Sequence, residues 1–341
     1  MRRVTASWGF AALLLTCACS ATKEDDGSAG AGQAPELASA PEKLTLNVFE
    51  SGAWYPATLS SFGYEAGQLV HMDRSDWSEA DGKWLPAGRL DWSWGPSGHC
   101  TMVAASSNGA PVTRRRFVWS ADGRLQAVVL DKPDGSAWQE TGQLTYGYDE
   151  TGQLASVDFD QAGADQPVRR WIWERTSAGK VDHVDEMDLD EEPPRLEHRT
   201  AVVWDAQGRV AEISLATGQG AGQEPFVWSE TKYTWNPEGT FGVEETAQRV
   251  DPKEQLVLNS RTSYSYDDEG RLVGQAVDGW NGTSWEPWFA SETAWMDMAL
   301  TTELARLRGS AMAGPEDAQW PTVLSTAATT FLGQIQLEDG L

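Results

Sequence analysis

Aromatic and apolar residues recur in a fixed frame along most of the chain. In the copy Tyr264-Ser-Tyr266-Asp-Asp-Glu-Gly270-Arg-Leu272, two aromatics stand two positions apart, turn-type residues follow, and a glycine precedes a basic and an apolar residue. Eight glycines occupy this frame, 25 to 31 residues apart: Gly67, Gly98, Gly123, Gly152, Gly179, Gly208, Gly239 and Gly270. A period of this length is typical of a repeat protein, in which each unit buries its apolar face against its neighbours.

Each copy has the chemistry of a β-hairpin. Two aromatics at i and i+2 point to one face of a strand. Asp149 and Asn236 suit the first position of a type I turn, Pro96 and Pro237 suit the second, and the glycine suits a left-handed residue that closes the turn with a bulge. An apolar residue stands two positions after each glycine and predicts a returning strand with one buried face: Leu69, Cys100, Leu125, Leu154, Val181, Val210, Phe241 and Leu272.

Two copies depart from the frame. The copy that ends at Leu69 is one residue shorter than the common frame. The copy before Gly179, aligned on Trp171-Ile-Trp173, is two residues longer than that frame. A second kind of turn lies between the copies, where Gly82, Gly135 and Gly282 follow Asp or Asn close to tryptophans. Two turns per repeat predict about 16 strands.

The expected fold is therefore all-β: tandem antiparallel β-hairpin repeats that form a curled meander sheet or shell. The spacing leaves closure as a barrel, a shell or a propeller open. Helical spacing of Met296, Leu300, Leu304 and Leu307 predicts a C-terminal capping helix, because an open sheet edge needs cover.

The expected domain organisation has four parts. Residues 1–18 have the charged start and short apolar stretch of a signal peptide, too short to span a bilayer. Residues 19–44 contain almost no large apolar residue and predict a disordered tether. Residues 45–295 form the repeat domain, and residues 296–341 form the cap, a helix plus a loop.

The run Leu-Leu-Leu-Thr-Cys17-Ala-Cys19-Ser resembles a bacterial lipobox. The resemblance implies that Cys19, preceded by Ala18, carries the lipid and becomes the first residue of the mature chain; Cys17 is the lesser alternative. Ser20 stands where an Asp favours retention at the inner membrane, so the resemblance implies a lipid-anchored protein of the cell envelope, at the outer membrane.

The form Tyr-x-Tyr-Asp-x-x-Gly-Arg-Leu at residues 264–272 resembles the YD repeat of the RHS family. In that family long arrays form shells that enclose a C-terminal toxin. This chain has eight units, several with Trp in place of Tyr, and no large domain after them, so the resemblance implies hairpin architecture and surface location rather than a toxin role.

The net charge of the chain and its reactive residue types limit the classes of function it can have. The formal net charge is −25, which argues against nucleic acid as a partner. The four histidines are scattered, no catalytic motif is present, and we expect neither a cofactor nor a bound metal. Cys100 takes the place of an apolar residue and is expected to be buried and unreactive. The acidic run at residues 185–192 is expected to be a solvated loop, with calcium binding as the lesser alternative.

We therefore expect a non-catalytic binding or scaffold protein, held at the membrane by its lipid. Tryptophans near the second turns are candidate contacts for a glycan or a surface protein, with packing between strands as the competing explanation: Trp77, Trp138, Trp280 and Trp285. The alternatives are a carbohydrate-active hydrolase with a carboxylate pair in a groove, a fragment-like relative of RHS toxin shells, and, as the least favoured, a membrane β-barrel.

Overall fold

The computed structural model describes residues 37–299, apart from residues 51, 66–67, 221–222, 250 and 269. This part of the chain folds into 18 strands and contains no helix. The strands are β1 (Leu37–Glu50), β2 (Ala53–Glu65), β3 (Gln68–Ser78), β4 (Lys83–Trp94), β5 (Cys100–Ser107), β6 (Ala110–Trp119), β7 (Leu125–Asp134), β8 (Ala137–Tyr148), β9 (Leu154–Gln161), β10 (Arg169–Arg175), β11 (Val181–Asp188), β12 (Arg195–Trp204), β13 (Val210–Thr217), β14 (Phe226–Trp235), β15 (Phe241–Gln248), β16 (Val257–Tyr266), β17 (Leu272–Trp280) and β18 (Trp285–Ala299).

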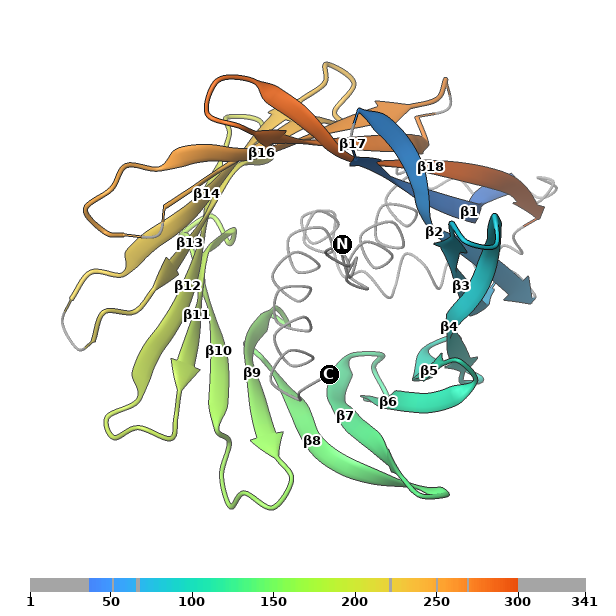
Figure 1. Cartoon of the computed structure of the whole chain (residues 1–341). Coiled ribbons are helices and arrows are strands. Elements are labelled where there is room, and N and C mark those ends of the chain that lie inside the picture. Colours follow the sequence, from blue (N-terminus) through green and yellow to red (C-terminus); the bar gives the residue numbers. More distant parts are fainter. Residues whose placement is uncertain are drawn as a thin grey trace, which may run out of the picture. The chain divides into compact units, whose positions relative to one another are not determined.

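The strands form a closed antiparallel meander. Each strand pairs with the next along the chain, and β1 also pairs with β18, so the sheet closes into a barrel (Figure 1). Residues 43–293 form one compact unit; of the second unit, only residues 37–42 and 294–299 are described, and both are extended strand. No helix of the described part is long and apolar enough to cross a membrane.

The 18 strands are two more than the expected number of about 16, because one strand precedes the first repeat hairpin and another follows the last. Two expected boundaries also shift. β1 begins at Leu37, inside the segment assigned to the tether, and β18 continues to Ala299, past the residue where the capping helix was expected to begin. The signal peptide, Cys19, the first part of the tether and the cap from residue 300 lie outside the described residues.

The repeat turns have the predicted conformation. Seven of the eight repeat glycines are described, and their φ angles lie between +76° and +88°. In each of these turns the glycine N–H donates to the carbonyl of the first turn residue, over 2.9–3.1 Å. The side chain of Asp205 shows why that position favours Asp: its Oδ1 accepts from the N–H groups of Gln207 and Arg209, both at 2.9 Å.

The copy before Gly179 starts later than the sequence predicted. Its turn has the common length, because the N–H of Gly179 donates to Thr176. The frame therefore begins at Trp173, and Arg175 stands where other copies have their second aromatic. The guanidinium of Arg175 donates to the carbonyl of Leu154 at 3.2 Å. Arg175 thus supplies the donor that the second aromatic side chain supplies in other copies.

The second aromatic of the repeat links each hairpin to the one before it. Its N–H or O–H donates to the backbone carbonyl of the apolar residue that follows the preceding repeat glycine. These bonds are Trp94 to Leu69 (2.7 Å), Trp119 to Cys100 (2.7 Å), Tyr148 to Leu125 (2.8 Å), Trp204 to Val181 (2.8 Å) and Trp235 to Val210 (2.8 Å). The bond explains why Trp and Tyr, which carry a donor, fill this position.

The two faces of the sheet differ in solvation. On the face of the repeat aromatics, burial raises the pKa of Tyr146 to about 12, raises that of Tyr233 and lowers that of Arg115. On the other face, Arg116 and Arg170 have raised pKa values because each donates to a carboxylate. In a closed barrel the inner side chains converge and shield one another, so we assign the aromatic face to the inside.

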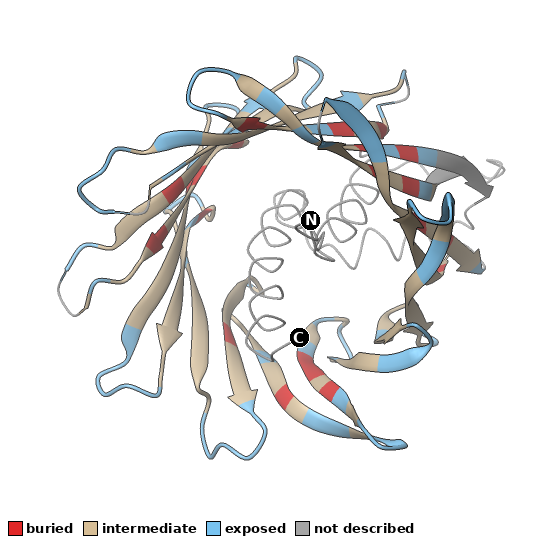
Figure 2. Cartoon of the chain, in the orientation of Figure 1, coloured by how far each residue is buried: buried red, intermediate tan, exposed pale blue. Residues whose placement is uncertain are grey.

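Buried residues come from strands all around the ring and do not gather in one core (Figure 2). Beyond the aromatics, the inner face has an apolar part on β4 to β9, which includes Leu90, Val128 and Val157, and a more polar part on β11 to β18. The polar part carries the groups from which a site can be built.

Candidate functional site on the inner face

The four candidate tryptophans lie near the second turns, and each packs against another side chain. Trp77 packs edge-on against Trp84, and Trp280 packs edge-on against Trp285, both with ring centroids 5.2 Å apart. Each pair lies directly opposite across its hairpin. Trp138 lies under the guanidinium of Arg114, 4.7 Å from its ring centroid.

These contacts explain the tryptophans as packing within their hairpins, because each aromatic pair contributes about 0.5–1.5 kcal/mol to stability beyond burial. All four are partly exposed, so a role in ligand contact stays a prediction. Two tryptophans outside that set are more accessible: Trp54 is 44% exposed and Trp288 is 39% exposed.

Cys100 is half-buried, and its thiol donates to the carbonyl of Met102 at 3.5 Å. Burial raises the pKa of this thiol to about 11. The thiolate is the reactive form, so this raised pKa disfavours reaction near neutral pH, whereas the thiol is half-buried and not fully buried as expected.

The sequence prediction of a solvated loop is wrong for the first half of the acidic run and holds for residues 189–192. The first half continues β11, and strand alternation sends neighbouring carboxylates to opposite faces. Asp185 lies on the outer face and pairs with Arg199 at 2.6 Å, whereas Glu186 lies on the inner face and is only 13% exposed. The run therefore supplies no continuous set of calcium ligands.

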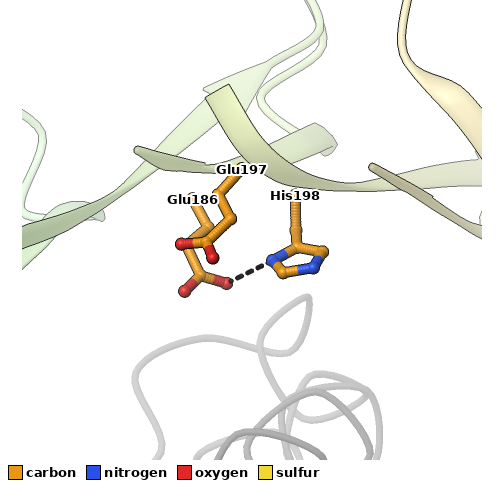
Figure 3. Close-up of side chains that lie close together, drawn as sticks. All are labelled: Glu186, Glu197 and His198. Carbon is orange, nitrogen blue, oxygen red and sulfur yellow. Dashed lines mark ion pairs between the residues drawn. The ribbon is translucent and has the colours of Figure 1, made fainter. Parts of the chain in front are cut away.

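Glu186 forms an inner-face cluster with two residues of β12. Glu186 lies opposite His198, and Glu197 is the extra residue of a bulge, so Glu197 and His198 both approach the same carboxylate. Figure 3 shows the three side chains leaving the two strands on the same side. One ligand-type atom from each lies within 4.8 Å of the others.

Charge within the cluster is nearly compensated. The Arg169 Nη1 lies 2.7 Å from Glu186 and 3.4 Å from Glu197, and the His198 Nδ1 lies 3.3 Å from Glu186. The hydrogen bond to Glu186 raises the pKa of His198. Burial acts to raise the pKa of Glu186, but the hydrogen bond and charge of His198, together with Arg169, outweigh burial and lower it.

This arrangement suits an ion-pair cluster better than a metal centre or an acid–base pair. A divalent cation would have to displace Arg169 and the proton of His198. A raised pKa also makes His198 a poor general base, and a lowered pKa makes Glu186 a poor general acid. Counting alternate residues from Val181 would place Asp185 on the aromatic face, but the register shift beside Arg175 places Glu186 there instead. The position of Glu197 depends on a second bulge, so neither carboxylate has a sequence signature.

No protein-family model matches the chain, and no curated protein matches its sequence. Among solved structures, a porin-like protein from Bacteroides uniformis is 8% identical, with a TM-score of 0.40, and the match covers 75% of this chain and 98% of that one. A TcdB2-TccC3 structure is 13% identical, with a TM-score of 0.37; the match covers 70% of this chain but only 12% of that one.

A porin-like protein from Bacteroides vulgatus is 9% identical, with a TM-score of 0.33, and the match covers 73% of this chain and 96% of that one. At these identities and scores the matches add no argument about function.

Proposed function

We propose that this protein is a non-catalytic binding or scaffold protein of the cell envelope, tethered through lipid on Cys19, with its barrel in water. Its binding surfaces are the partly exposed tryptophans near the second turns and the polar part of the inner face, and its expected partners are a glycan or a surface protein.

The observation that carries the proposal is a set of ion pairs on the outer face. Arginines there donate to carboxylates on strands all around the ring: Arg89 to Asp91 (2.7 Å), Arg116 to Asp131 (2.8 Å), Arg170 to Asp158 (2.6 Å), Arg199 to Asp185 (2.6 Å) and Arg261 to Asp278 (2.7 Å). These side chains are charged and mostly partly exposed to water.

A membrane barrel has the opposite arrangement. Its outer face is an apolar band, and an Arg or Lys facing lipid near the midplane costs about 2–4 kcal/mol. Here ion pairs recur on the outer face, and the repeat aromatics lie on the inner face. A water-exposed barrel therefore fits the outer face better than a lipid-embedded one.

The absence of catalysis is supported by the inner-face cluster, whose carboxylate and imidazole neutralise each other. The hydrolase alternative needs two carboxylates with opposed pKa values across a groove. In the Glu186 cluster the ion pairs with Arg169 and His198 hold the carboxylate in its charged form.

Fractionation of cells tests the proposal. The natural chain should sediment with membranes and incorporate a palmitate analogue, and Cys19→Ala should abolish the label while Cys17→Ala retains it. A second chain, with residues 1–19 replaced by a cleavable export signal, should appear in the aqueous extract without detergent. Retention of that second chain in the membrane after a carbonate wash would show that the barrel itself is embedded, and hydrolysis of a glycan by the purified chain would remove the non-catalytic assignment.

A further inference from the structure

We propose that the inner face of β16 to β18 is a binding site for an uncharged saccharide. The site consists of Tyr264, Gln275, Ser291 and Thr293, called here the Gln275 row. This inference deepens the proposed binding function, on which it rests, and moves the ligand from the second-turn tryptophans to the inside of the barrel.

The pairing register brings the row together. Tyr264 of β16 lies directly opposite Gln275 of β17, and Gln275 lies directly opposite Ser291 of β18. Thr293 follows Ser291 by two positions and therefore shares its face. Three neighbouring strands thus present a continuous line of hydroxyl and amide groups.

Three residues of the row are buried, yet their side-chain polar atoms are unpaired. Gln275, Ser291 and Thr293 are 4%, 3% and 8% exposed. Among the described residues, neither amide atom of Gln275 has a hydrogen-bond partner, and neither hydroxyl oxygen of the other two has one. Buried polar groups are almost always paired, so four unpaired atoms in one row point to a ligand that pairs with them.

The carboxyl beside the row is shifted toward its neutral form. The hydroxyl of Tyr264 is 2.6 Å from Glu244, and burial raises the pKa of that carboxyl, which favours its protonated, neutral form. The cation on the same strand, Arg261, donates to Asp278 on the outer face. A phosphate would meet the Glu244 carboxyl, while Arg261 is paired with Asp278. Hydroxyl groups, which both donate and accept, match an amide and two hydroxyls.

Aromatic rings border the row on the same face. The ring of Phe241 lies 6.0 Å from that of Tyr264 and 4.1 Å from that of Trp235, measured between centroids. Apolar ring surfaces beside a few convergent polar groups are the usual composition of a small-molecule site. A saccharide offers C–H faces that pack on the aromatic rings and hydroxyl groups that pair with the row. An extended peptide would cover the rings only if its own side chains were apolar.

The test uses the full mature chain and a panel of neutral oligosaccharides, with a Pro-free neutral peptide as the comparison ligand, followed by calorimetry on the best binder. Gln275→Met removes the amide at similar volume. We expect it to weaken saccharide binding at least tenfold and to leave the melting temperature unchanged or higher, because an unpaired buried amide is replaced by an apolar group. Val203→Ala, at a position that is 53% exposed and outside the row, is the control and should leave the affinity within twofold. Trp285→Ala tests instead whether a second turn contributes to the same binding. Because the row is shielded, association should also be slow, below the usual 10⁵ M⁻¹s⁻¹ or so.

Other outcomes overturn the inference. Binding lost in Trp285→Ala but not in Gln275→Met would place the glycan at the second turns, and the proposed function would stand without the Gln275 row. Binding of the peptide and not of any saccharide would assign the row to a different ligand class. If the chain binds no saccharide and Gln275→Met destabilises it, the row is structural. The fractionation experiment tests the proposed function separately: a barrel that appears in the aqueous extract would keep that function standing even if the row binds nothing.

Discussion

The ammonium group of Lys180 lies 4.9 Å from the centroid of the Trp204 ring. Lys180 directly follows one repeat glycine, and Trp204 is the second aromatic of the next repeat. The same relationship recurs between Arg124 and Tyr148 at 5.6 Å, and His99 stacks on the ring of Trp119 at 4.6 Å.

The motif Gly-basic-apolar therefore couples successive hairpins. The glycine closes the turn, the basic side chain covers the next ring, and the carbonyl of the apolar residue accepts a hydrogen bond from that same ring. Each cation–π contact of this exposed kind contributes about 0.5–1 kcal/mol.

Substitution of Gly208 tests the turn geometry. Its φ of +80° disfavours any residue with a Cβ, and a Cβ there would also meet the end of the Lys180 side chain. We expect Gly208→Asn to cost about 1 kcal/mol and Gly208→Val more than 2 kcal/mol in urea melts, because Asn tolerates positive φ and a β-branched residue does not.

Gly270 is the matched control, because its φ is +76° and nothing lies within 4 Å of the Cβ position. Gly270→Ala should show the backbone cost alone, and Gly208→Ala that cost plus displacement of Lys180. Equal costs for Val and Asn at position 208 would mean that the turn does not need the left-handed conformation.

Tyr148→Phe tests the hydrogen bond between repeats. The change removes only the hydroxyl that donates to the carbonyl of Leu125 at 2.8 Å. We expect a loss of about 0.5–1.5 kcal/mol in the free energy of unfolding. Tyr55→Phe, at a position that is 40% exposed, should change it by less than about 0.5 kcal/mol, and an equally small loss at position 148 would contradict the inter-repeat role.

Glu186→Ala should be clearly destabilising, contrary to the expectation for a solvated loop. The substitution leaves Arg169 and His198 without their shared carboxylate. A loss of about 1.5–3 kcal/mol is the usual range for hydrogen bonds to charged groups. Glu191 is 49% exposed in its pair with Arg195, so Glu191→Ala should stay within about ±0.5 kcal/mol in the same denaturation assay.

The pair of His198 and Glu186 should also make stability depend on pH. His198 has a raised pKa, so its contribution is complete below its unfolded pKa of about 6.5 and is lost as pH rises through the higher folded value. Glu186 has a lowered pKa, so its contribution is present above its unfolded value and is lost as pH falls through the folded one. Thermal melts from pH 4 to 9 should show stability falling at alkaline pH in the natural chain, and falling less in His198→Gln. If stability falls equally with pH in both chains, the His198–Glu186 pair is not the source of the alkaline loss.

The repeat frame predicted the hairpins and the turns because both depend on residues a few positions apart. The frame before Gly179 was misread because Arg175 supplies the donor that aromatics supply elsewhere, and composition alone does not show that equivalence. The strand count fell short because the hairpins at Gly52 and Gly282 extend the array by one strand at each end.

The inner-face groups were not predictable for a different reason. Glu197 joins His198 through a bulge, and Gln275 meets Ser291 through the register of two strands. Such contacts are set by pairing across strands and by closure of the ring, which the spacing left open. Alternation within one strand shows which residues share a face but not which neighbours they meet.

The most direct test of a water-exposed barrel is cysteine labelling of the lipid-anchored protein in intact membranes. In a Cys100→Ala background, Arg116→Cys, Arg170→Cys and Arg199→Cys place a thiol on the outer face, and Tyr233→Cys places one on the inner face. A charged, membrane-impermeant maleimide, applied where the outer surface is accessible, should label all three outer positions rapidly and the inner position slowly. Protection of the three outer positions, relieved only by detergent, would show that the outer face lies in lipid and would contradict the account.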